Sequence, residues 1–151
     1  MNLDFGLWYF AHPLSCRYPD GRRNRVAEEA NYGLSVHRTA VLLDTGICVF
    51  SPIPHSFVVD RALPQFLSEH TELPWYTIDD FIIDRTDWDG IILAPNWEGS
   101  VGCVEENERI VFKRGLLQFT YEDILTTATK RPGILERAVR TNREVRTSRK
   151  E

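Results

Sequence analysis

The segment spanning residues 90–106 restricts the fold of this chain more than any other. Residues 90–94 form an apolar run that is too short for a helix and is typical of a buried strand. A polar turn follows, and Ser100 occupies the position of a helix N-cap. Glu106 lies six residues after that cap, about two helical turns along. A strand, a turn and a helix in this order indicate an open α/β sheet, which binds ligands beyond the carboxyl ends of its strands.

Further short apolar segments alternate with helical ones. Strands are predicted at residues 7–11, 47–50 and 115–119, in addition to the strand near residue 91. Helices are predicted at 22–44, 62–68, 77–88, 121–129 and from Ile134 onward. Strands and helices that alternate through short connections predict parallel pairing with right-handed crossovers.

Three details of the helices can be read from the pattern. In the first helix, the apolar residues are expected to face the core; these are Val26, Ala30, Leu34 and Val41. Gly46 is a plausible stop after its last turn. Thr77 and Asp80 have the spacing of a capping box, and residues 51–56 read as a polar turn.

Length, charge and cysteine content exclude several classes of protein. The chain has 151 residues, which suits one domain, and a net charge of −4. Eight Lys and Arg but only three Glu lie between Thr129 and Glu151, so an acidic body carries a basic tail, unlike a dedicated DNA-binding domain. The three cysteines lack metal-ligand spacing and suggest a reduced, cytoplasmic protein. No apolar run approaches the length of a membrane span.

Three segments resemble a known family. Residues 9–15 read YFAHPLS, residues 49–56 read VFSPIPHS, and residues 96–106 read NWEGSVGCVEE. They resemble the YLAHPYS, VFSPIxHS and GWxxSxGxxxE segments of small bacterial and phage proteins related to nucleoside 2-deoxyribosyltransferases, and they occur in the same order. The resemblance implies a Rossmann-like (flavodoxin-like) three-layer sandwich with about five parallel strands in residues 1–130. Residues 131–151 would form a basic C-terminal helix or tail.

The resemblance also implies a reaction and assigns roles to residues. The reaction is cleavage or transfer of the N-glycosidic bond of a nucleoside or nucleotide, with Glu106 as nucleophile and Tyr9 orienting it. An aspartate of the preceding helix would protonate the base, but the family spacing, counted back from Asp89, lands on Phe81. Asp80 is the choice for this role, and Asp79 and Asp84 remain open alternatives.

The same comparison predicts how the substrate is held. Serine at position 100, where enzymes of free nucleosides carry an acid, implies a 5′-phosphorylated substrate, and a helix N-terminus suits a phosphate. Trp97 would stack on the base or pack against the sheet. No metal or organic cofactor is expected, and related enzymes are homo-oligomers. The expected substrate-binding set is His12, Pro13, Ser51, Trp97, Ser100, Gly102 and Asp84.

The chemistry explains why two carboxyl groups are needed. Breaking an N-glycosidic bond passes through an oxocarbenium-like state, which one carboxylate stabilises while a second acid protonates the leaving group. Water then gives hydrolysis, and a second base gives transfer. The blander alternatives are a solvated Glu106, a core Tyr9 and an Asp80 that only caps its helix. The rival function is a non-catalytic module that senses or sequesters a nucleotide in the same pocket.

Overall fold

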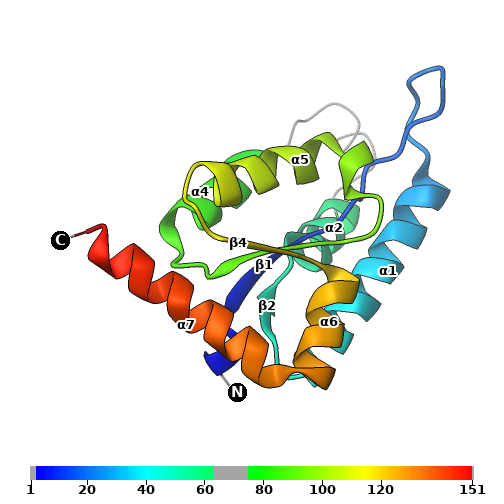
Figure 1. Ribbon diagram of the computed structural model, residues 1–151. Helices are drawn as coiled ribbons and strands as arrows, with labels where there is room; N and C mark the ends of the chain where they lie inside the picture. Colours follow the sequence, from blue (N-terminus) through cyan, green and yellow to red (C-terminus); the bar gives the residue numbers. More distant parts are fainter. Residues whose placement is uncertain (1–2, 63–74, 151) are drawn as a thin grey trace.

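The computed structural model describes residues 3–62 and 75–150. In this part of the chain, four parallel strands form one sheet with the order β2–β1–β3–β4. The architecture is the expected Rossmann-like α/β sandwich, with four strands in the described residues where the family resemblance implied about five (Figure 1). The strands are β1 (Leu7–Ala11), β2 (Cys48–Phe50), β3 (Gly90–Leu93) and β4 (Leu117–Thr120).

Helices cover both faces of the sheet, because alternate residues of each strand point to opposite sides (Figure 1). Trp8 and Phe10 pack with α1, α6 and α7, whereas Tyr9 and Ala11 pack with α4, α5 and η3. The helical elements are η1 (Leu3–Phe5), α1 (Arg25–Asp44), α2 (Pro52–Ala62), α4 (Trp75–Arg85), η2 (Trp97–Gly99), α5 (Val101–Asn107), the π-helical turn η3 (Glu108–Phe112), α6 (Tyr121–Lys130) and α7 (Pro132–Ser148).

The buried face of α1 differs from the expected one. Val26 is 79% exposed and Leu34 is 44% exposed, so the predicted apolar face does not face the core. Glu28, Ser35 and Leu42 are buried instead, at intervals of seven residues. The acid is tolerated inside because Arg23 binds both oxygens of the Glu28 carboxylate, at 3.1 and 2.7 Å. A buried ion pair thus overrides the hydrophobic pattern.

Two predictions, on helices α2 and α4, are wrong. The polar turn expected at residues 51–56 is instead the start of α2, where Pro52 occupies the first helical position that suits proline. α4 begins at Trp75, so Thr77 lies inside the helix and does not start a capping box. The expected short helix at 62–68 lies, beyond Ala62, outside the described residues.

The basic C-terminal helix α7 is docked on the sheet. Leu135 and Val139 are buried in the core, and Arg143 reaches the buried Asp89 with two hydrogen bonds of 2.7 Å. Arg146 adds a bond of 2.8 Å to the same carboxylate. The arginines of α7 therefore divide between solvent and a buried acid.

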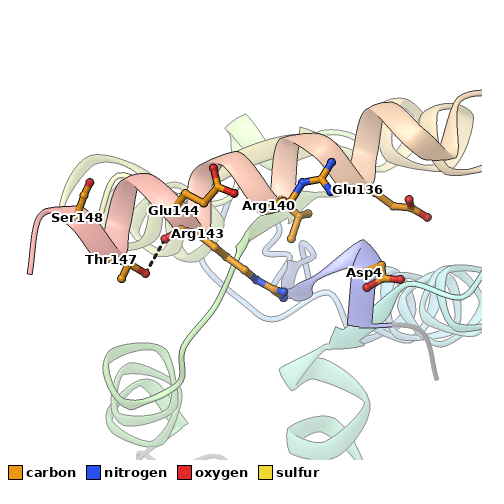
Figure 2. Close-up of a pocket in the computed structure, with 8 residues that line it drawn as sticks. Asp4, Glu136, Arg140, Arg143, Glu144, Thr147 and Ser148 are labelled. Carbon is orange, nitrogen blue, oxygen red and sulfur yellow. Dashed lines mark hydrogen bonds between the residues drawn. The ribbon is translucent and has the colours of Figure 1, made fainter.

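A groove of about 600 Å³ runs along α7 beside the N-terminal segment (Figure 2). Arg143 extends from the helix toward the segment that carries Asp4, while Glu144 points away from it (Figure 2). The charged groups of this groove are of both signs, and its Arg143 is already committed to Asp89. In the described residues, none of the helices is long and apolar enough to span a membrane.

Candidate active site

A second cavity, of about 410 Å³, lies at the carboxyl edge of the sheet. The strand order changes direction between β1 and β3, and α/β sheets bind ligands at such a switch point. The loop after β1 and the helix after β3 both contribute to the walls, and α2 and α4 complete them. The lining residues are His12, Leu14, Ser15, Arg17 and Arg23; Pro52, Ile53, Ser56 and Phe57; Asp79; and Gly99, Ser100, Val101, Gly102, Cys103 and Glu106.

The start of α5 has the predicted local structure. Ser100 is the N-cap, and its hydroxyl accepts a hydrogen bond from the N–H of Cys103 at 3.4 Å. Gly102 follows on the cavity wall, and a Cβ at this position would meet no atom within 4 Å. The first turn of α5 therefore leaves open space above its backbone, as expected for a ligand that approaches closely.

Glu106 lies two turns into the same segment and lines the cavity. Burial, followed by the charge of Asp79, raises the pKa of its carboxyl group from 4.5 to about 8. The Tyr9 hydroxyl opposes this shift, because a hydrogen-bond donor favours the carboxylate. Glu106 is therefore largely protonated at neutral pH.

Tyr9 lies beneath this carboxyl group. Its side chain is fully buried and packs edge-on against Trp88, with ring centroids 5.6 Å apart. The hydroxyl makes no hydrogen bond of ordinary length with any described residue, yet it interacts with Glu106 strongly enough to change the pKa of that carboxyl group. Burial, followed by the charge of Glu106, raises the pKa of Tyr9, so the phenol stays a neutral donor.

Among the three aspartates of α4, only Asp79 lines the cavity. Burial, followed by the charge of Asp80, raises its pKa to about 6, against the opposing effect of His55. Asp80 and Asp84 instead bind Arg109, at 3.1 and 2.6 Å. The structure thus places Asp79 in the cavity with Glu106. Asp80, which the sequence analysis chose, binds a cation outside the cavity.

His12 lines the cavity, but its ring is committed to the protein. Nδ1 lies 2.8 Å from the carbonyl oxygen of Pro13, and Nε2 lies 2.8 Å from Arg38. Because the guanidinium can only donate, Nε2 accepts and Nδ1 carries the proton. Burial lowers the pKa of His12 and the charge of Arg38 lowers it further, whereas the Pro13 bond raises it. The neutral ring therefore stabilises the loop after β1 through these two hydrogen bonds.

Trp97 and Ser51, two expected substrate-binding residues, lie outside the cavity lining. Trp97 packs against the core cluster beneath α4 and α5. The Ser51 hydroxyl is buried and has no partner among the described residues. Ser51 precedes α2, so its hydroxyl would accept a hydrogen bond from the N–H of the third helical residue. That residue is Pro54, which has no N–H.

Other cavity residues escaped the sequence reasoning. Ile53, Ser56 and Phe57 line the cavity because they share one face of α2, and that helix was expected to be a turn. Recognising Pro52 as a first helical residue would have revealed them. Arg17 and Arg23 also line the cavity, and a bridge between their backbones holds them there.

Comparison with known proteins places the chain in a family. In the described residues, no group of three or more histidine, cysteine or acidic side chains could hold a metal ion. No curated protein matches the sequence significantly. A family model described as a domain of unknown function, DUF1937, matches residues 6–122, which include all four strands and every residue that lines the cavity. The chain therefore belongs to the DUF1937 family.

Proposed function

We propose that this protein cleaves the N-glycosidic bond of a nucleoside 5′-monophosphate, by hydrolysis or by transfer. One observation carries the proposal: Glu106 and Asp79, two carboxyl groups with raised pKa values, line the same cavity. Two such groups in one site are what glycosidic cleavage requires. The cavity volume of about 410 Å³ falls within the range of small-molecule sites, about 300–1,000 Å³.

The roles follow from the surroundings of the two acids. The ionised Glu106 attacks the anomeric carbon, the bond from that carbon to the base nitrogen breaks, and its electron pair goes to the base. Asp79 gives its proton to that nitrogen, which releases a neutral base. Water, activated by the Asp79 carboxylate, then hydrolyses the glycosyl ester on Glu106. Tyr9 supports the attack, because its hydroxyl favours the ionised form of Glu106.

The cavity wall supports a substrate with an apolar end and an anionic end. Leu14, Ile53 and Phe57 provide an apolar surface for a planar base. Arg17 and the hydroxyl of Ser100 provide polar contacts for a phosphate. Arg23 also lines the cavity, but its guanidinium already binds Glu28, so Arg17 is the stronger candidate for the phosphate.

The test is release of free base from a panel of nucleosides and 5′-monophosphates, followed by chromatography. We expect base release from at least one monophosphate and a loss of about a thousandfold in Glu106→Gln, because the amide cannot attack. Arg17→Ala should raise KM for the monophosphate much more than for the matching nucleoside. Full activity of Glu106→Gln would refute the role of Glu106.

A non-catalytic nucleotide-binding module is the second candidate. The observation that favours it is the pKa of about 8 for Glu106, which leaves the proposed nucleophile mostly neutral at physiological pH. Saturable binding of a monophosphate without base release, unchanged in Glu106→Gln, would select this alternative. Titration calorimetry with the same nucleosides and monophosphates measures this binding.

We also propose that the protein is cytoplasmic and works as a homo-oligomer. The three cysteines are free, which suits a reducing compartment. Val101 is 75% exposed at the rim of the cavity, and Phe112 is 76% exposed further along the same segment. Exposed apolar side chains beside a site suit a subunit contact. Light scattering of the protein, compared with Phe112→Ser, tests this proposal.

A further inference from the structure

Arg109 connects the two helices that carry the acids of the cavity. It lies in the π-helical turn η3, directly after α5, where the N–H of Lys113 donates to the carbonyl oxygen of Glu108 at 3.1 Å. Its guanidinium reaches across to α4 and binds Asp80 at 3.1 Å and Asp84 at 2.6 Å. π-helical turns are rare and occur frequently at functional sites.

The helical geometry of α4 links this contact to the cavity. Asp80 and Asp84 are four residues apart, so both lie on the face that meets Arg109. Asp79 precedes Asp80 and therefore projects about 100° away around the helix. It shares its face with Ile83, which is fully buried in the core beneath the cavity. Binding of Asp80 to Arg109 and burial of Ile83 thus fix the same rotation of α4.

A second arginine fastens the end of α4 without touching its acids. Arg114 donates to the carbonyl oxygens of Ile83 and Thr86, at 2.5 and 2.9 Å. These bonds hold the C-terminal turn of α4 in place but do not distinguish Asp79 from Asp80. Of the arginines that bind α4, Arg109 is the one that contacts the neighbour of Asp79.

We propose that Arg109 is a positioning residue that holds the Asp80 carboxylate outside the cavity and partly neutralises it beside the two acids that line the cavity, Asp79 and Glu106. The inference rests on the proposed function, since it takes Asp79 and Glu106 as the reacting pair. The buried Ile83 and the bonds from Arg114 also hold the rotation of α4. Removal of the Arg109 guanidinium, 3.1 Å from Asp80, therefore exposes the two cavity acids to the full charge of Asp80.

The charged groups around Asp79 and Glu106 determine how the loss of Arg109 changes the pKa values of these two acids. Asp79 is influenced by Asp80 on its own helix and by His55 of α2. Glu106 is influenced by Asp79 and Asp80 of α4, by Tyr9 of β1 and by its neighbour Glu105. Asp80 raises the pKa of both acids, so a loss of the cation that binds Asp80 raises both of them further.

The experiment titrates the two carboxyl groups in the ligand-free protein by carbon-detected NMR, so its readout does not depend on catalysis. In Arg109→Met we expect the titration midpoints of Asp79 and Glu106 to rise by about half a pH unit. The double variant R109M/D80N should return both midpoints to the wild-type values or below, because the uncompensated charge is gone. Arg109→Lys keeps the charge and should shift them less.

The matched control is Arg85→Met, which removes a positive charge from α4. Arg85 lies over the Phe81 ring at 4.2 Å and has no ion pair with Asp80 or Asp84. We expect its titration curves to resemble those of the wild type. Equal curves in R109M and R85M would overturn the inference whether or not the protein cleaves nucleotides. If R109M does not fold, D80N decides: midpoints that do not fall in D80N overturn it as well.

Discussion

Asp79 and Glu106 lie on different helices and line one cavity, and the charge of Asp79 raises the pKa of Glu106. Their pKa values of about 6 and about 8 place the more easily ionised acid on α4. The proposed mechanism needs the opposite distribution, with a proton on Asp79 and a charge on Glu106. The reactive form is thus a minor protonation state of the pair, and the Tyr9 hydroxyl is the group that favours the ionised Glu106.

This relationship predicts the pH dependence of the reaction. Deprotonation of both acids removes the proton donor, and protonation of both removes the nucleophile. A plot of kcat/KM against pH should therefore be bell-shaped, with limbs near pH 6 and pH 8. The limbs belong to the pair, because the two groups interact. Measurement of kcat/KM from pH 4.5 to 9.5 tests the curve. A rate that rises steadily to pH 9.5 would remove Asp79 as the general acid.

Glu106→Gln should stabilise the protein at alkaline pH. The folded-state pKa of Glu106 is raised, so the stability that the proton provides is complete below about pH 4.5 and is lost as the pH rises toward 8. The amide does not ionise, and we expect a gain of about 1–3 kcal/mol in the free energy of unfolding at pH 8.5 and little change at pH 4.5.

Urea denaturation at both pH values measures this difference. Glu105→Gln is the control, since its side chain is exposed next to Glu106. It should change the free energy of unfolding by less than about 0.5 kcal/mol at either pH. A destabilised Glu106→Gln at pH 8.5 would contradict the raised pKa of this acid in the folded protein.

Tyr9→Phe should separate stability from activity. The buried hydroxyl has no ordinary hydrogen bond to a described residue, so its removal relieves an unsatisfied polar group. We expect an unchanged or higher Tm, together with a higher pKa of Glu106, because the phenol favours the carboxylate. Calorimetry and NMR titration measure the two effects. Tyr18→Phe, on the exposed loop, is the control and should change neither.

The fold could be predicted from the sequence because its signals are local. Apolar runs located the strands, and the Ser100 N-cap after the run at residue 91 is confirmed. The strand-end rule alone placed Ser100, Gly102 and Glu106 around one hollow, and all three line the cavity. These features depend on neighbouring residues, which the sequence shows directly.

The remaining parts depend on contacts between distant residues. The buried Glu28 on α1 is compatible with the core only because Arg23 binds it. Asp79 lines the cavity while Asp80 binds Arg109, which lies in a π-helical turn of another segment that no local pattern indicates. The sequence could therefore narrow the second acid to a short stretch of α4, but it could not fix the rotation of that helix.

Gly102→Ala should improve the fold and weaken ligand binding. A Cβ at this helical position meets no protein atom within 4 Å, so alanine adds helix propensity worth up to about 1 kcal/mol. The same methyl group would enter the cavity that Gly102 lines. Gly33→Ala, also inside a helix and with open space around the added Cβ, is the matched control.

Thermal melts and nucleotide titrations compare the two glycine variants. Both should raise the Tm by similar amounts, and only Gly102→Ala should lower the affinity for a monophosphate, by about tenfold or more. Equal affinity in the two variants would mean that no ligand approaches the first turn of α5.

Asp89→Asn should release the C-terminal helix. Asp89 is 2% exposed and accepts hydrogen bonds from Arg143, from Arg146 and from the N–H of Leu7. Burial by itself would raise its pKa, but these bonds and the two positive charges lower it below the ordinary value. Its contribution to stability is therefore present above about pH 4 and is lost as the pH falls through the lowered pKa.

The substitution should cost about 2–4 kcal/mol at pH 7, because it leaves two arginines without their buried partner. The difference from the wild type should shrink as the pH falls through the lowered pKa of Asp89, since the folded wild type then loses the charge of this carboxylate. Asp87→Asn is the control: Asp87 also binds Arg146, at 3.2 Å, but its side chain is 87% exposed, so the cost should stay near zero. A similar loss of unfolding free energy in both variants would show that burial does not distinguish the two ion pairs. The docking of α7 would then depend on its buried apolar residues, Leu135 and Val139.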